Sequence, residues 1–188
     1  FFTLLSSLFS QFGFIGINVF NILCAVSTAY FTFLIAKKLN IGNPLFAPLF
    51  VLFTPLYFVV LISGLTEPLF GLMLMASIYL TLTVRFFTTA LLVSFLPFVR
   101  SEGYLLLLLF AAVFIYRKKF FLLPWLAAGT VIYSIAGCFH YHNLLWVIYN
   151  NPYGDAKNIY GSGSLFHFIA NNEFILGTPL VILFIAGL

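Results

Sequence analysis

The chain has 188 residues and a formal net charge of +4; 63% of its residues are hydrophobic and only 6% are charged. An ordinary soluble domain has about 25% charged residues. Eight basic and four acidic side chains are too few to cover a soluble protein of this length, so the composition excludes a soluble enzyme, a disordered chain and a nucleic-acid-binding protein.

The chain contains a series of apolar runs separated by charged residues, glycines and prolines. A helix that crosses a bilayer needs about 20 apolar residues. In chain order the runs cover residues 14–36, 44–62, 68–84, 87–99, 104–116 and 120–139, with a last run from Phe174. They predict an all-α, polytopic transmembrane domain of about six to seven membrane segments over residues 1–188. Because the chain begins at Phe1 without a signal-peptide pattern and stops inside an apolar run, we expect it to be an internal piece of a longer protein.

The runs 87–99 and 104–116 are short, since each reaches only about 20 Å as a helix. If they formed a single span, Arg100 and Glu102 would lie near its middle. Inserting each charge into the membrane there would cost about 2.5–3.5 kcal/mol. If they formed two crossings or a re-entrant hairpin, Arg85 and the basic run 117–119 would lie on the same side. The positive-inside rule favours the hairpin.

With that hairpin the charged residues separate into two groups. One face receives only basic residues and is predicted to be cytoplasmic: Lys37, Lys38, Arg85, Arg117, Lys118 and Lys119. The opposite, outer face receives Glu67, Arg100, Glu102, Asp155, Lys157 and Glu173. Acidic residues have little influence on topology, so their gathering on the outer face points to function.

Two short outer segments hold the main candidate residues. Glu67 precedes Pro68, which is typical of a first-turn acid with Thr66 or Ser63 as the helix cap, or of a carboxylate that faces a polar cavity. Arg100 and Glu102 form either a structural ion pair at the hairpin tip or an anion site, because Arg binds phosphate through two parallel hydrogen bonds.

The polar segment 140–172 is longer than a tight turn. Trp146 and Tyr149 are typical of interfacial residues, so residues 144–149 are expected along the membrane surface. His140 and His142 do not have the spacing of a metal site, and we expect no metal and no cofactor. The segment also supplies candidate hydrogen-bonding residues: Asp155, Lys157, Tyr160 and His167.

The sequence of Ser63 to Phe70, SGLTEPLF, and that of Arg100 to Gly103, RSEG, resemble two motifs of the multi-spanning GT-C glycosyltransferases. The motifs are S-x-x-x-E-x-L-F at an outer helix start and R-x-E-G after a short apolar run. The nearest branch is similar to the mannosyltransferase-like and Rgt-like bacterial membrane proteins. The order and separation of the motifs fit over residues 63–116, and residues 160–168 are similar, less specifically, to a downstream loop.

This resemblance implies a bacterial plasma-membrane hexosyltransferase of the cell envelope, which uses a polyprenyl-phosphate sugar. The family's general base is expected upstream of Phe1, so no catalytic residue is assigned. Arg100 would bind the donor phosphate, and Glu67 and Glu102 would bind the sugar hydroxyls or Arg100 itself. The four residues of the polar segment would contact the acceptor or other parts of their loop. Two alternatives remain: a transporter or flippase for a lipid-linked or small polar substrate, and a non-catalytic membrane subunit.

Overall fold

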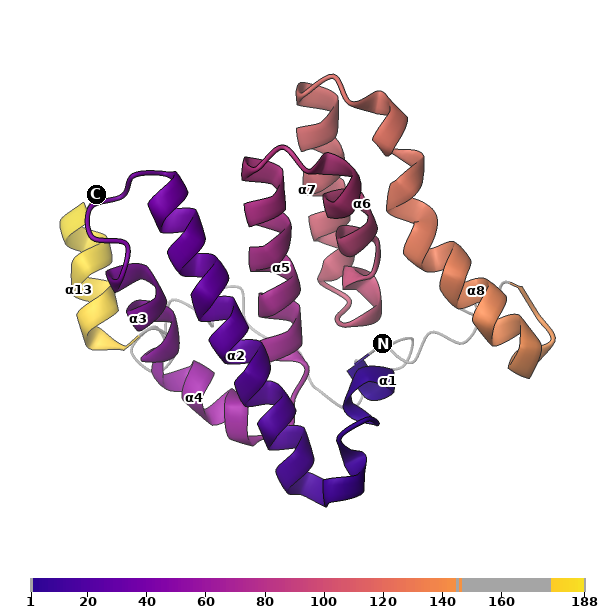
Figure 1. Cartoon of the computed structure of the whole chain (residues 1–188), viewed down its shortest axis with the longest axis horizontal. Helices are drawn as coiled ribbons and strands as arrows, with labels where there is room; N and C mark the ends of the chain where they lie inside the picture. The colour runs from indigo at the N-terminus through magenta and orange to yellow at the C-terminus, as the bar shows by residue number, and fades with distance from the viewer. Residues whose placement is uncertain (1, 145, 147–176, 188) are drawn as a thin grey trace.

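The computed structural model describes residues 2–144, 146 and 177–187, and this part of the chain is helical with no strand, as predicted. Figure 1 shows the arrangement of the elements. The α-helices are α1 (Phe2–Ser6), α2 (Gly13–Lys38), α3 (Phe46–Leu52), α4 (Pro55–Ile62), α5 (Glu67–Leu82), α6 (Phe86–Ser94), α7 (Gly103–Tyr116), α8 (Ala128–Tyr141) and α13 (Thr178–Gly187). Short 3₁₀ turns are η1 (Ser10–Phe12), η2 (Leu96–Phe98), η3 (Phe120–Leu122) and η4 (Pro124–Ala127).

Helix α2 matches the first predicted run and packs along α5. Its 26 residues contain no proline and rise about 39 Å, enough to cross a bilayer. Small side chains lie buried on it, among them Ala25, Thr28 and Ala29. Small residues allow two helix backbones to approach closely, which explains the tight α2–α5 packing.

The run 44–62 does not form the single long helix that its hydropathy suggests. It divides into α3 and α4 because Pro55 lacks an N–H and holds Thr54 in an extended conformation, with φ −67° and ψ 122°. Each piece rises only about 10–12 Å, too little to cross a bilayer. Helix α4 then meets α5 at a bend of 118°.

By length and composition, the described residues contain two helices able to cross a membrane, and a third if the bent pair of α4 and α5 counts as one span. The two are α2 and the run Phe120–Phe139, which includes η3, η4 and most of α8. The described residues therefore show two to three candidate spans and do not show the six to seven that were expected.

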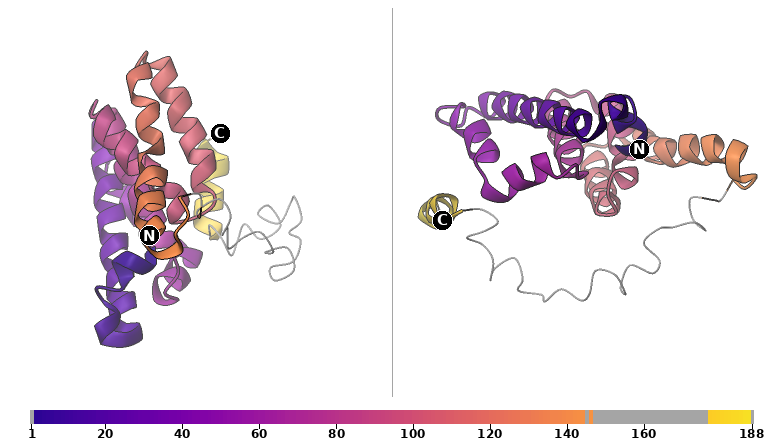
Figure 2. Two further views of the ribbon diagram at one scale, coloured as in Figure 1. Left: turned by 90° about the vertical axis from the view of Figure 1, so that its right-hand side faces the viewer. Right: turned by 90° about the horizontal axis from the view of Figure 1, so that it is seen from below.

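The two short runs fold into an antiparallel hairpin of α6 and α7, as the charge pattern predicts (Figures 1 and 2). Gly103 lies at its tip against the backbone of Leu96 and Pro97, where an added Cβ would be only 2.3 Å from the Leu96 carbonyl carbon. Glycine at this position therefore lets the tip close.

Away from the tip, toward the middle of its helices, the hairpin packs into the main hydrophobic core. Ala90, Val93, Leu96 and Phe114 are completely buried there. The N-terminus of α8 joins the same core through a buried hydrogen bond from the Gly129 N–H to Ser94 Oγ at 3.0 Å. The core thereby fixes the position of the loop that carries Arg100.

The charged residues of the described helices divide between the two ends of the structure. The C-terminal ends of α2, α5 and α7 lie at one end of the structure, so the six basic residues of the predicted cytoplasmic face gather there. The α4–α5 turn and the hairpin tip lie at the other end, with Glu67, Arg100 and Glu102. We call these the basic end and the paired end.

Candidate functional site

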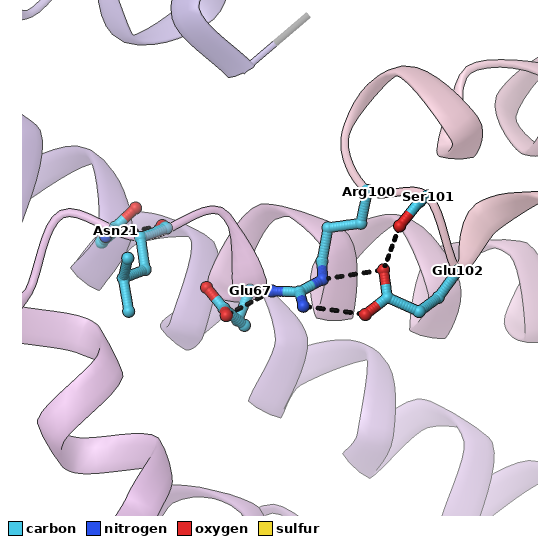
Figure 3. Close-up of polar contacts among 6 residues, drawn as sticks. Asn21, Glu67, Arg100, Ser101 and Glu102 are labelled. Carbon is cyan, nitrogen blue, oxygen red and sulfur yellow. Dashed lines mark hydrogen bonds and ion pairs between the residues drawn. The ribbon is translucent and has the colours of Figure 1, made fainter. Parts of the chain in front are cut away.

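At the paired end, Arg100 lies between two carboxylates (Figure 3). Its Nη1 donates to Glu67 Oε1, while Nε and Nη2 donate to Glu102 Oε2 and Oε1 at 3.2 and 2.8 Å. The contact with Glu102 is bidentate, which is the strongest geometry for such a pair. The two predicted segments, 33 residues apart at Glu67 and Arg100, are thus joined by one guanidinium.

Glu67 is the first residue of α5, where a negative charge is favourable next to the unpaired N–H groups of the helix. The expected cap is absent, however. Thr66 makes no capping hydrogen bond, and the Ser63 hydroxyl donates to the Val59 carbonyl of the preceding helix at 2.6 Å. The turn instead depends on Gly64, whose φ of +67° is readily adopted only by glycine.

Asn21 supports this turn from α2 and was not predicted from the sequence. Its Nδ2 donates to the Leu65 carbonyl at 3.2 Å, and its side chain is completely buried. A buried Asn inside an apolar helix is energetically expensive, and that cost is the signal that marks it. The hydrogen bond fixes the loop that presents Glu67 (Figure 3).

Three buried oxygens near this turn accept no hydrogen bond from the described residues: Asn18 Oδ1, Asn21 Oδ1 and Glu67 Oε2. Asn18 and Asn21 are three residues apart and share one face of α2. A buried polar atom without a partner costs about 1–3 kcal/mol. These three buried acceptors therefore add to the free-energy cost of forming this part of the structure.

A hollow of about 410 Å³ opens beside the ion pairs. It is lined by Gly64, Leu65, Thr66, Glu67, Arg100, Ser101 and Glu102. Every one of these residues belongs to the two segments singled out in the sequence. The cluster therefore forms a polar surface at the end of the structure opposite the six basic residues.

The ion pair shifts the pKa values of both Arg100 and Glu102. The hydrogen bond from Arg100 lowers the pKa of Glu102, against the opposing effect of burial. The same bond raises the pKa of Arg100. Glu102 thus stays ionised at neutral pH and is a weak proton acceptor. Within the described structure, Arg100 uses three of its five N–H groups, which leaves two for a ligand.

The four candidate acceptor contacts, Asp155, Lys157, Tyr160 and His167, lie outside the described residues, as does Tyr149. Trp146 is described, and its indole N–H donates to the Tyr133 carbonyl at 3.1 Å, so it packs back on α8. Among the described residues, no three His, Cys, Asp or Glu side chains come together as a metal site requires.

Comparison of the chain with protein-family models, with curated proteins and with solved structures gave no match.

Proposed function

We propose that the protein is a membrane glycosyltransferase, which transfers a sugar from a polyprenyl-phosphate donor to an acceptor hydroxyl on the outer side of the membrane. One observation carries the proposal: Arg100 joins the two segments that resemble the glycosyltransferase motifs, beside a polar hollow of about 410 Å³. Charged residues at the end of an apolar domain are energetically expensive, which favours a functional role for this cluster.

The proposed reaction is a displacement at the anomeric carbon of the donor sugar. The acceptor oxygen forms a bond to that carbon and loses its proton to a base, while the bond from the carbon to the phosphate oxygen breaks. The electron pair leaves with the lipid phosphate, whose negative charge a cation stabilises.

The residues of the paired end fit the binding of sugar and phosphate. Glu67 holds Arg100 in place, the exposed carboxylate of Glu102 accepts hydrogen bonds from sugar hydroxyls, and the two remaining N–H groups of Arg100 donate to a phosphate oxygen. Since two carboxylates already face Arg100, sugar hydroxyls are the main ligands in this proposal. Neither carboxylate is assigned as the base, because both are engaged by Arg100.

The membrane orientation is part of the same proposal. The protein would cross the bacterial plasma membrane about six to seven times, with its basic end in the cytoplasm. Two helices long and apolar enough to cross a bilayer and the gathering of six basic residues at one end support this arrangement.

The test is transfer of a radiolabelled hexose from polyprenyl phosphate in membranes that contain the protein. We expect Glu67→Gln and Arg100→Gln to lower the transfer rate by about 100-fold or more, as loss of a charge-stabilising donor does in other enzymes. Lys38→Gln removes a charge from the basic end and is the control, with an expected change below about twofold. Wild-type transfer by both site variants, or no transfer by the wild-type protein, would contradict the proposal. Movement of the donor across the membrane without transfer would favour the transporter.

A further inference from the structure

A second hollow, of about 320 Å³, lies at the basic end, where the α5–α6 turn meets the α7–η3 turn. It is lined by Thr81, Leu82, Val84, Phe86, Arg117 and Lys119. Two cationic side chains and three apolar side chains thus share one concave surface, far along the helices from the paired end (Figure 1).

Hydrogen bonds at the helix ends fix the backbone of both turns. The Arg85 N–H donates to the Leu80 carbonyl at 2.9 Å, and the Lys119 N–H donates to the Phe114 carbonyl at 2.8 Å. This is the pattern of a Schellman motif. Val84 has a φ of 64°, which is an outlier for a β-branched residue and is held only because its surroundings determine it.

The charges of this end are not neutralised by the described residues. Both described ion pairs belong to Arg100, and the acids in them, Glu67 and Glu102, lie at the paired end. In the described part of the chain, Arg117 and Lys119 therefore face the hollow without a counter-ion. A fixed concave surface with two uncompensated cations attracts an anion.

Aromatic residues close in sequence to those that line the hollow indicate the depth in the membrane at which this anion would lie. Tyr116 and Phe121 are 83% and 78% exposed, and Trp125 packs on Phe87 with ring centroids 4.8 Å apart. Exposed Tyr and Trp at the ends of apolar helices mark the level of the lipid headgroups. At that depth the abundant anions are the phosphates of lipids, and basic pockets between helices bind such headgroups.

We propose that the hollow at the basic end binds the phosphate of an anionic phospholipid. Arg117 and Lys119 contact the phosphate, and Leu82, Val84 and Phe86 contact the glycerol and the first carbons of the acyl chains. The inference depends on membrane association alone and is independent of the glycosyltransferase activity.

The experiment is native mass spectrometry of the purified protein in detergent, titrated with phosphatidylglycerol or phosphatidylcholine. We expect phosphatidylglycerol to bind at least about 10-fold more tightly, and the double variant R117Q/K119Q to lower that affinity by about 10- to 30-fold. The matched control is K37Q/K38Q, which removes two charges from the same end but outside the hollow. It should change the affinity by less than about twofold.

Two further measurements separate the alternatives. Thr81→Phe keeps every charge and fills the hollow, so it should weaken lipid binding by about as much as R117Q/K119Q. It therefore tests the hollow independently if R117Q/K119Q folds poorly. Inorganic phosphate at millimolar concentration should not displace the lipid. Equal losses in the two charge variants would show diffuse attraction, displacement by inorganic phosphate would show a site for the free anion, and an unaffected Thr81→Phe would show that the hollow is not used. Each of these results would overturn the proposal.

Discussion

At the paired end, Arg100 shares its guanidinium with Glu67 and Glu102, whereas at the basic end six Lys and Arg side chains gather with no described acid among them. The few charged residues are thus arranged differently at the two ends. At the paired end, charges of opposite sign hold two chain segments in a fixed arrangement. At the basic end, charges of one sign produce an electrostatic field, which we propose orients the protein in the membrane and attracts anions. Substitutions should therefore affect stability and geometry at the paired end, and mainly orientation and lipid binding at the basic end.

The largest expected effect on stability comes from Gly103 at the hairpin tip. Gly103→Ala places a Cβ 2.3–2.5 Å from the backbone of Leu96 and Pro97, so the tip must open, at a cost of about 3 kcal/mol in the free energy of unfolding. The control is Gly71→Ala on α5, where the added Cβ would have no atom from another part of the chain within 4 Å. The higher helix propensity of Ala should raise the free energy of unfolding by about 0.5–1 kcal/mol. Unfolding in mixed micelles measures both. Equal stability of the two variants would contradict the close packing of the tip.

Arg100→Gln should be the next most harmful change. It leaves Glu67 and Glu102 facing each other without a cation, and we expect a loss of about 1–2 kcal/mol, since the pairs are partly exposed to solvent. Arg85→Gln at the basic end removes the same charge and should change stability by less than about 0.5 kcal/mol. The same unfolding assay applies. Equal losses in the free energy of unfolding for Arg100→Gln and Arg85→Gln would contradict the stabilising role of the charges at the paired end.

Asn21→Leu should have an intermediate effect. It removes the donor to the Leu65 carbonyl, at about 1 kcal/mol, but it also removes the unpaired Oδ1 and adds apolar volume. We therefore expect a small loss of stability with a larger loss of order in the turn that carries Glu67. Hydrogen exchange of the 63–67 amides measures that order. Exchange at the wild-type rate would contradict the supporting role of Asn21.

The smallest effect concerns pH. The pKa of Glu102 in the folded protein lies below its ordinary value of 4.5, so the ionised pair contributes stability above about pH 4.5. This contribution is lost as the pH falls through the lowered pKa. Because Glu102 is half exposed, the change should be below about 1 kcal/mol, and it should disappear in Glu102→Gln. An identical pH profile of the variant and the wild-type protein would contradict it.

Some of this structure was predictable because it depends on local patterns. The run that forms α2 contains no proline, and the charges at 85, 100 and 117–119 predicted the α6–α7 hairpin. The break at Thr54 was missed because Pro55 lies inside a continuous apolar run. Such a run has no alternation of apolar and polar residues from which the ends of a helix could be located. The expected caps of α5 were wrong because Ser63 bonds to a carbonyl one turn back, which competes with capping.

The charged residues of the candidate cluster, Glu67, Arg100 and Glu102, were identified from the sequence, and their contacts were left as alternatives. The Arg100–Glu102 pair was one alternative, and a contact of Glu67 with Arg100 was implied only by the family resemblance. The bond between Arg100 and Glu67 spans 33 residues and depends on how α5 packs on the hairpin, which no local pattern encodes. Asn21 was missed because the average hydropathy of a long apolar run conceals its few polar residues.

The most direct test of the paired end is the charge-exchanged variant Glu67→Arg with Arg100→Glu. The exchange restores one ion pair between the two segments, so stability should return to within about 1 kcal/mol of the wild-type value. If the cluster binds sugar and phosphate, the rate of hexose transfer from polyprenyl phosphate should nevertheless stay about 100-fold below the wild-type rate. Recovery of both stability and wild-type transfer would contradict the account, because it would show that the cluster only holds the two segments together.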